Sequence, residues 1–177
     1  MAAAKYNEKI FLELFKNKVR GTTLSEQKTF AFNDEKNRRL SSSVDYYFEH
    51  DNRQMLVEID SYNMAKVLVG QYLLLNQFRD ETLINPLFLV VHTYKGYEPE
   101  RTIKYLEHVK DKVLQGTGMP FGVIHINTFK NWAGGDTDGF VRLFNAYPAV
   151  TSTLACISSA PYAPRTNTTP QSLRADD

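Results

Sequence analysis

The residues of this 177-residue chain whose types and spacing could do chemistry are three acidic side chains, Asp45, Glu58 and Asp60. They stand in two neighbouring stretches, 43–50 and 53–60, in which apolar and polar residues alternate. Such alternation is typical of β-strands that bury one face. We therefore interpret the two stretches as paired strands, which bring the three carboxyl groups close together.

The two strands form a hairpin if Asp51-Asn52 is its two-residue turn, because this pair of residues favours tight turns. Asp45 then lies opposite Glu58, and Asp60 shares the face of Glu58 because strand side chains alternate. The other face of the hairpin is apolar, and we expect it to pack through Val44, Tyr46, Phe48, Met55, Val57 and Ile59. A turn of another length would move a carboxylate to the opposite face.

Three carboxylates in one small area repel each other, so they need a bound cation or raised pKa values. Oxygen ligands alone suit Mg²⁺ or Mn²⁺ better than Zn²⁺. Such an ion polarises phosphoryl oxygens and activates water, so the pattern indicates metal-assisted hydrolysis of phosphodiester bonds. The alternative is an ordinary exposed acidic face, with Arg53 or a lysine paired to the carboxylates.

Asp45, followed after twelve residues by Glu58-Ile59-Asp60 at the end of an apolar strand, resembles the PD-(D/E)xK nuclease superfamily. This superfamily includes many restriction enzymes and DNA-repair nucleases. The resemblance covers roughly residues 5–126 and implies a restriction-endonuclease-like core of helix, three-strand meander, helix and strand. It also implies that Asp45 and Glu58 bind the metal. The third position normally carries a lysine that orients the attacking water, and here it carries Asp60, as ligand or base.

Three further residues are candidates for this site. Lys66, in the polar sector of the next expected helix, would supply the missing cation; extension into solvent is the alternative. Gln71 lies in the apolar part of that helix, where some branches of the superfamily use a Gln; a structural Gln with its own hydrogen-bond partners is the alternative. Glu8 falls within the apolar arc of the first helix and would be a further metal ligand, unless it only complements the helix dipole.

The pattern of apolar residues predicts one α/β domain over residues 1–157, followed by a disordered tail over 158–177 that is rich in Pro, Ser and Thr. The expected elements are a helix at 5–19, strands at 28–32, 43–50 and 53–60, a helix at 63–76, a strand at 87–94, a helix at 99–115, a strand at 121–126, a helix at 136–146 and a strand at 150–157. This order predicts a mixed central sheet flanked by helices. His92 and His125 are interpreted as core histidines.

The composition excludes several classes of protein. An aromatic content of 12% excludes a disordered chain, and the single Cys156 excludes a disulfide scaffold. The sequence contains no run of about 18 apolar residues, so it predicts no membrane span. The start of the chain lacks a hydrophobic signal region, so we expect a cytoplasmic protein. A net charge of +1 argues against a polybasic membrane binder but leaves room for a local basic patch.

Lys36, Arg38 and Arg39 form such a patch, and we expect them to contact the phosphates of DNA; a solvated basic face is the alternative. The loop 93–97 carries two tyrosines beside a lysine and would suit a nucleic-acid strand, unless it is an ordinary exposed loop. The sequence thus predicts a Mg²⁺- or Mn²⁺-dependent endonuclease acting on DNA, as a homodimer or with a partner subunit. The alternative is an inactive protein of this fold that binds nucleic acid or serves in an assembly.

Overall fold

The structure is a computed structural model that describes residues 2–33, 39–79 and 83–144. The helices are α1 (Ala2–Lys18), α2 (Ala65–Phe78), α3 (Pro99–His108), which continues as a short π-helix η1 (Val109–Val113), α4 (Ile126–Asn131) and α5 (Thr137–Phe144). The strands are β1 (Val19–Arg20), β2 (Ser25–Asn33), β3 (Arg39–His50), β4 (Arg53–Asp60), β5 (Leu87–His92), β6 (Phe121–His125) and β7 (Gly135–Asp136).

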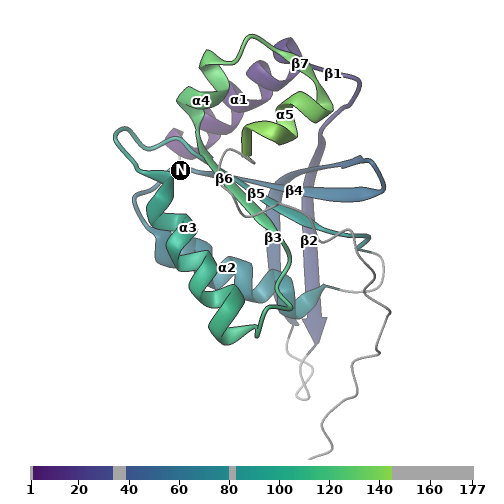
Figure 1. Ribbon diagram of the computed structural model, residues 1–177, viewed down its shortest axis with the longest axis vertical. Coiled ribbons are helices and arrows are strands. Elements are labelled where there is room, and N and C mark those ends of the chain that lie inside the picture. The colour runs from purple at the N-terminus through teal and green to yellow at the C-terminus, as the bar shows by residue number, and fades with distance from the viewer. Residues whose placement is uncertain (1, 34–38, 80–82, 145–177) are drawn as a thin grey trace, which may run out of the picture.

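The centre of the molecule is a five-stranded mixed sheet in the order β2-β3-β4-β5-β6 (Figure 1). The meander β2–β3–β4 is antiparallel, whereas β5 and β6 run parallel to β4. All six residues of β5 are buried, as expected of a central strand that is covered on both faces. The predicted α/β class, with a mixed sheet flanked by helices, is confirmed.

The hairpin between β3 and β4 has the predicted register from His50 and Arg53 to Tyr46 and Val57, but the pairing stops before the expected pair of Asp45 and Glu58. Its turn is Asp51-Asn52, and both residues have positive φ, 50° and 53°, as a type I′ turn requires. His50 pairs with Arg53, and Phe48 pairs with Met55. The two-residue turn therefore keeps the acidic side chains of β4 on one face, as the hydrophobic pattern required.

Two layers of helices cover the sheet. Figure 1 shows α1, α4 and α5 on one face and α2 and α3 on the other. The first layer packs the aromatic rings of α1, α4 and α5 against the odd-numbered residues of β4 and β5, such as Val57 and Leu89. The second layer packs α2 and α3 against the even-numbered ones, such as Leu56 and Phe88. Glu58 and Asp60 belong to this second face by alternation.

Several predicted details were wrong. Val44 packs in the α2 layer and not with Tyr46 and Phe48, because it lies beyond Tyr46, where β3 no longer pairs with β4. The predicted helix 99–115 is an α-helix only to His108. Helix α4 and the small parallel β1–β7 sheet were not predicted, because both are too short to leave a periodic pattern.

The remaining predictions on chain organisation concern other parts of the chain. The strand expected at 150–157 and the tail at 158–177 lie outside the described residues. None of the helices in the described ranges is both long and apolar enough to cross a bilayer.

Candidate active site

Asp45 lies where the strands β3 and β4 stop pairing. The ladder of paired residues ends at Tyr46 and Val57, one step before Asp45 and Glu58 would face each other. Beyond this point the backbone amide of Ile59 donates a hydrogen bond of 2.7 Å to Oδ2 of Asp45. The carboxylate thus takes the place of a backbone acceptor, and the two strands are held apart by a side chain.

Glu58 points from β4 toward α2, where Gln71 holds it. Nε2 of Gln71 donates to Oε2 of Glu58 at 2.7 Å and to the backbone carbonyl of Ser43 at 2.7 Å. Gln71 is therefore a structural residue with its own hydrogen-bond partners, and one of these partners is the carboxylate of Glu58. Its amide links α2 to β3 and β4 at the position of the carboxylates.

Burial raises the pKa of both carboxyl groups. The pKa of Asp45 rises to about 6, first because of burial and then because of the negative charges of Glu8 and Asp60, against the lowering effect of the Ile59 amide. The pKa of Glu58 rises to about 8, first because of burial and then because of the charge of Asp45, while the Gln71 hydrogen bond opposes the shift. Asp45 thus lies close enough to Glu8 and Asp60, and Glu58 close enough to Asp45 and Asp60, for their negative charges to act on it.

The two oxygens of Asp60 have partners other than Asp45 and Glu58. Oδ1 accepts a hydrogen bond of 3.1 Å from the backbone amide of Tyr62. Oδ2 lies 2.8 Å from Nδ1 of His92, which is an ion-pair distance outside hydrogen-bond angles. Both of these atoms are buried and have no hydrogen-bond partner in the described part of the chain. The lysine position of the resembled family therefore holds an acid that is paired with a histidine.

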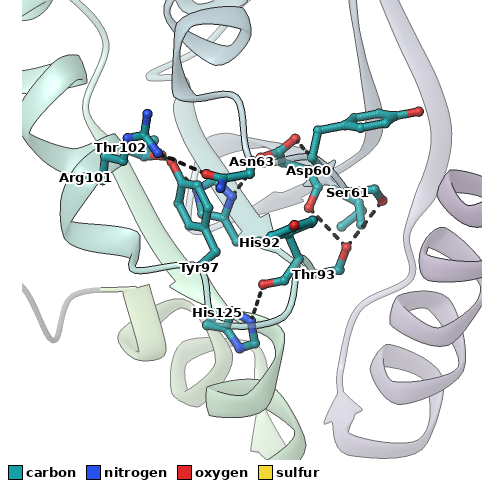
Figure 2. A network of polar contacts seen from close by, with 12 residues as sticks. Asp60, Ser61, Asn63, His92, Thr93, Tyr97, Arg101, Thr102 and His125 are labelled. Carbon is teal, nitrogen blue, oxygen red and sulfur yellow. Dashed lines mark hydrogen bonds and ion pairs between the residues drawn. The ribbon is translucent and has the colours of Figure 1, made fainter.

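His92 is the site residue whose role the sequence did not reveal. Its side chain is fully buried, stacks on Tyr97 with ring centroids 3.9 Å apart, and places Nε2 2.8 Å from Oγ1 of Thr102. Oγ1 of Thr102 also lies 2.8 Å from the hydroxyl of Tyr97. Figure 2 shows these side chains joined to Asp60 in one network between β4, β5 and α3. The prediction of a core histidine is confirmed for His92, and its partner is a carboxylate.

The other predicted residues lie around this centre. Glu8 is half-buried on α1, and its charge acts on Asp45. Lys66 is exposed on α2 and makes no hydrogen bond or ion pair with a described residue. Arg39 is exposed at the start of β3, six residues and about 20 Å of extended strand from Asp45. Lys36 and Arg38 lie outside the described residues.

His125, the partner of His92 in the β5–β6 register, is bound differently. Its Nδ1 accepts a hydrogen bond from the amide of Asn127, and its Nε2 lies 3.1 Å from the carbonyl oxygen of Tyr94. His125 is partly exposed and shares no contact with the carboxylates in the described ranges. We find no role for it in the site.

The carboxylates lie near each other but do not form a complete set of ligands for a metal ion. Within residues 2–33, 39–79 and 83–144, no three His, Cys, Asp or Glu side chains are grouped so that they could hold a metal ion by themselves. The arrangement offers two partly buried carboxylates, Asp45 and Glu58, each with one oxygen held by a hydrogen bond. An ion bound there needs further ligands from water or substrate.

Comparison with known proteins gives no family. No family model and no curated protein matches the chain. A solved structure titled as a protein of unknown function, AF1548, aligns with a TM-score of 0.35 and 10% sequence identity. The alignment covers 67% of this chain and 56% of that one. A similarity of this size identifies neither a fold family nor a function.

Proposed function

We propose that the chain is a Mg²⁺- or Mn²⁺-dependent endonuclease that hydrolyses phosphodiester bonds in DNA. The observation that carries the proposal is the pair of partly buried carboxylates, Asp45 and Glu58, at the point where β3 and β4 separate. Burial and the negative charges of neighbouring carboxylates raise the pKa of both groups. A divalent cation between them would remove this repulsion. The order of the sheet and its helices agrees with the core expected from the resemblance to PD-(D/E)xK nucleases.

The residues present fit a hard divalent cation. Mg²⁺ is commonly bound by one or two carboxylates and completes its shell with waters and substrate phosphates, so a full protein cage is not required. Asp45 and Glu58 would hold the ion, with Glu8 and Asp60 close enough to add negative charge. When bound, such an ion polarises the phosphoryl oxygen and lowers the pKa of a water molecule.

The chain itself would contribute position and charge. The amide of Ile59 fixes one oxygen of Asp45, and Gln71 fixes one oxygen of Glu58, so neither carboxylate has to reorganise when an ion arrives. His92 fixes Asp60 beside them. In this arrangement Asp60 would add negative charge beside Asp45 and Glu58.

The test is a calorimetric titration with Mn²⁺, followed by incubation of plasmid, linear and single-stranded DNA with Mg²⁺ or Mn²⁺. We expect a metal site in the unmodified chain that Asp45→Asn and Glu58→Gln both abolish, together with all cleavage. Glu107→Gln, an exposed glutamate on α3, is the matched control and should change neither. Metal binding that survives both site variants would refute the proposal.

A second candidate is a protein of the same fold that binds nucleic acid or serves as an assembly subunit without cleaving anything. The observation in its favour is that Asp60 stands where a nuclease of the resembled superfamily has lysine, while Lys66 is exposed. The same titration separates the two: DNA binding without any Mn²⁺ site and without cleavage would select this candidate.

The remaining partners follow from the reaction. Arg39, exposed at the start of β3, would contact a phosphate at a distance from the carboxylates, with Lys36 and Arg38 beside it in the sequence. Cleavage of both strands would require two copies of the chain or a partner subunit. Sedimentation with and without a duplex tests this, and cell fractionation tests the expected cytoplasmic location.

A further inference from the structure

Three segments that are distant in the sequence meet at the hydroxyl of Ser61, directly after the candidate site. Oγ of Ser61 accepts a hydrogen bond of 3.0 Å from Nδ2 of Asn7 on α1 and one of 3.3 Å from Oγ1 of Thr93 after β5. Thr93 also donates through its amide and its hydroxyl to the carbonyl oxygen of Asp60, at 2.8 and 3.1 Å. Figure 2 shows Asp60, Ser61 and Thr93 in this junction.

Each of these segments carries an exposed tyrosine next to the junction. Tyr6 precedes Asn7, Tyr62 follows Ser61 and Tyr94 follows Thr93. Their exposed fractions are 65%, 56% and 46%, so all three rings stand largely in water. A single exposed aromatic residue needs no explanation, but here each of the three segments of one junction carries an exposed ring. This tyrosine surface consists of Tyr6, Tyr62 and Tyr94.

Basic side chains outnumber acidic ones in the three segments that carry the tyrosine surface. The three segments that carry it, 5–9, 61–67 and 93–101, contain five basic side chains against three glutamates. The basic ones are Lys5, Lys9, Lys66, Lys95 and Arg101. Arg101 is tied to the surface, since its NH1 donates to Oδ1 of Asn63 at 3.0 Å. A surface of aromatic rings with cations at its border is the arrangement that binds unpaired nucleic-acid strands.

We propose that the tyrosine surface binds an unpaired strand of DNA by stacking bases on its rings, and delivers the strand to the neighbouring carboxylates. Paired bases in a duplex cannot reach rings that stand on a protein surface, because their faces are already stacked, whereas every unpaired base offers a free face. The backbone amide of Tyr62 donates a hydrogen bond to Oδ1 of Asp60, so the tyrosine surface adjoins the candidate site. The delivery step rests on the proposed function, whereas the binding step does not.

The experiment measures binding in EDTA, without any metal, by fluorescence anisotropy of a labelled 20-nucleotide oligo-dT and of a duplex of equal length. We expect the full chain to bind the single strand more tightly. Tyr62→Ala and Tyr94→Ala should each weaken that binding about tenfold, because stacking is the interaction removed. Tyr62→Phe keeps the ring and should bind like the unmodified chain. Tyr105→Ala, on α3 and 41% exposed, is the matched control.

The outcomes separate this inference from the proposed function. Loss of oligo-dT binding in Tyr62→Ala and Tyr94→Ala but not in Tyr105→Ala supports the tyrosine surface, whether or not any DNA is cleaved when metal is added. Equal or tighter binding of the duplex, or an equal loss in Tyr105→Ala, overturns it even if the chain proves to be a nuclease. Cleavage that is absent with Mg²⁺ and Mn²⁺ while the tyrosine surface still binds would refute only the proposed function.

Discussion

The two helical layers of the molecule differ in what they bury. The layer of α1, α4 and α5 is built around phenylalanine rings, with Phe140 at the centre of Phe15, Phe129 and Phe144 at centroid distances of 5.1, 5.0 and 5.3 Å. The layer of α2 and α3 buries polar side chains beside its apolar core. His92 and Thr102 are both fully buried there, and Glu58 is held by Gln71.

This difference indicates that the α1, α4 and α5 layer stabilises the fold, whereas the α2 and α3 layer carries the candidate site. Burying apolar rings stabilises a fold, whereas burying a polar or charged group costs free energy unless it is fully paired. A fold that accepts such a cost for His92, Asp60 and Glu58 is expected to do so for a function. The carboxylates therefore mark the α2 and α3 side of the β4 end as the place where chemistry is to be sought.

The largest expected effect is on the phenylalanine layer. Phe140 is fully buried, so Phe140→Ala should lower the free energy of unfolding by about 3–5 kcal/mol. Urea denaturation measures the loss. The Mn²⁺ affinity of the folded protein should stay unchanged, because the ring touches the opposite face of the sheet. A variant that kept its stability but lost the metal would show that the two layers are not separate.

A substitution in the α2 and α3 layer should raise the free energy of unfolding instead of lowering it. Burial raises the pKa of Glu58 to about 8, so between its ordinary value near 4.5 and 8 the folded chain holds a proton that the unfolded chain has released. Stability therefore falls as pH rises through this window. Glu58→Gln removes the ionisable group and should raise the free energy of unfolding at pH 8 by about 1–3 kcal/mol, with little gain at pH 4.5.

Urea denaturation at both pH values, without metal, measures this gain. Glu107→Gln, on an exposed glutamate, is the control and should show no difference between the two pH values. A loss of stability at pH 8 in Glu58→Gln would mean that the charged form of Glu58 is stabilised in the fold, which contradicts the repulsion among the carboxylates.

The sequence was sufficient for the hairpin but not for the network around it. Alternation and the Asp51-Asn52 turn fixed the register of β3 and β4, because both are local signals. The pairing of Asp60 with His92 depends on the parallel register of β4 and β5, which a crossover of more than twenty residues separates in the chain. No local pattern encodes that register. The only signal available was that both residues end apolar strands, which meet at the same edge of a parallel sheet.

Gln71 shows a second kind of limit. Its position in the apolar part of a helix predicted that it needs hydrogen-bond partners, but which atoms accept them depends on how α2 lies on the sheet. Lys66 shows a third kind of limit. The sequence predicted its position on the polar side of the helix, but not the direction of its long exposed side chain. In each case the element was predictable, and the contact between elements was not.

A smaller effect is expected at Gln71. Its hydrogen bond lowers the pKa of Glu58, so Gln71→Ala should raise that pKa further. Since a metal ion must displace the proton, the pH midpoint of Mn²⁺ binding should move upward by about one unit, as a hydrogen bond to a charged group is typically worth 1.5–3 kcal/mol. Titrations between pH 6 and pH 9 measure the shift. Gln27→Ala, which loses only a bond to the hydroxyl of Ser43, should leave the midpoint in place.

The smallest effect is expected at Lys66. Its size shows whether this lysine takes part in the proposed reaction. The side chain of Lys66 is exposed. Its charge is not among the causes that shift the pKa of Asp45 or of Glu58. Lys66→Ala should therefore change stability by less than about 0.5 kcal/mol and the cleavage rate by less than about twofold. A group that transfers or orients a proton in the reaction typically contributes about a hundredfold or more. A loss of that size would assign to Lys66 the cationic role that Asp60 cannot fill, and the site would then extend across the first turn of α2.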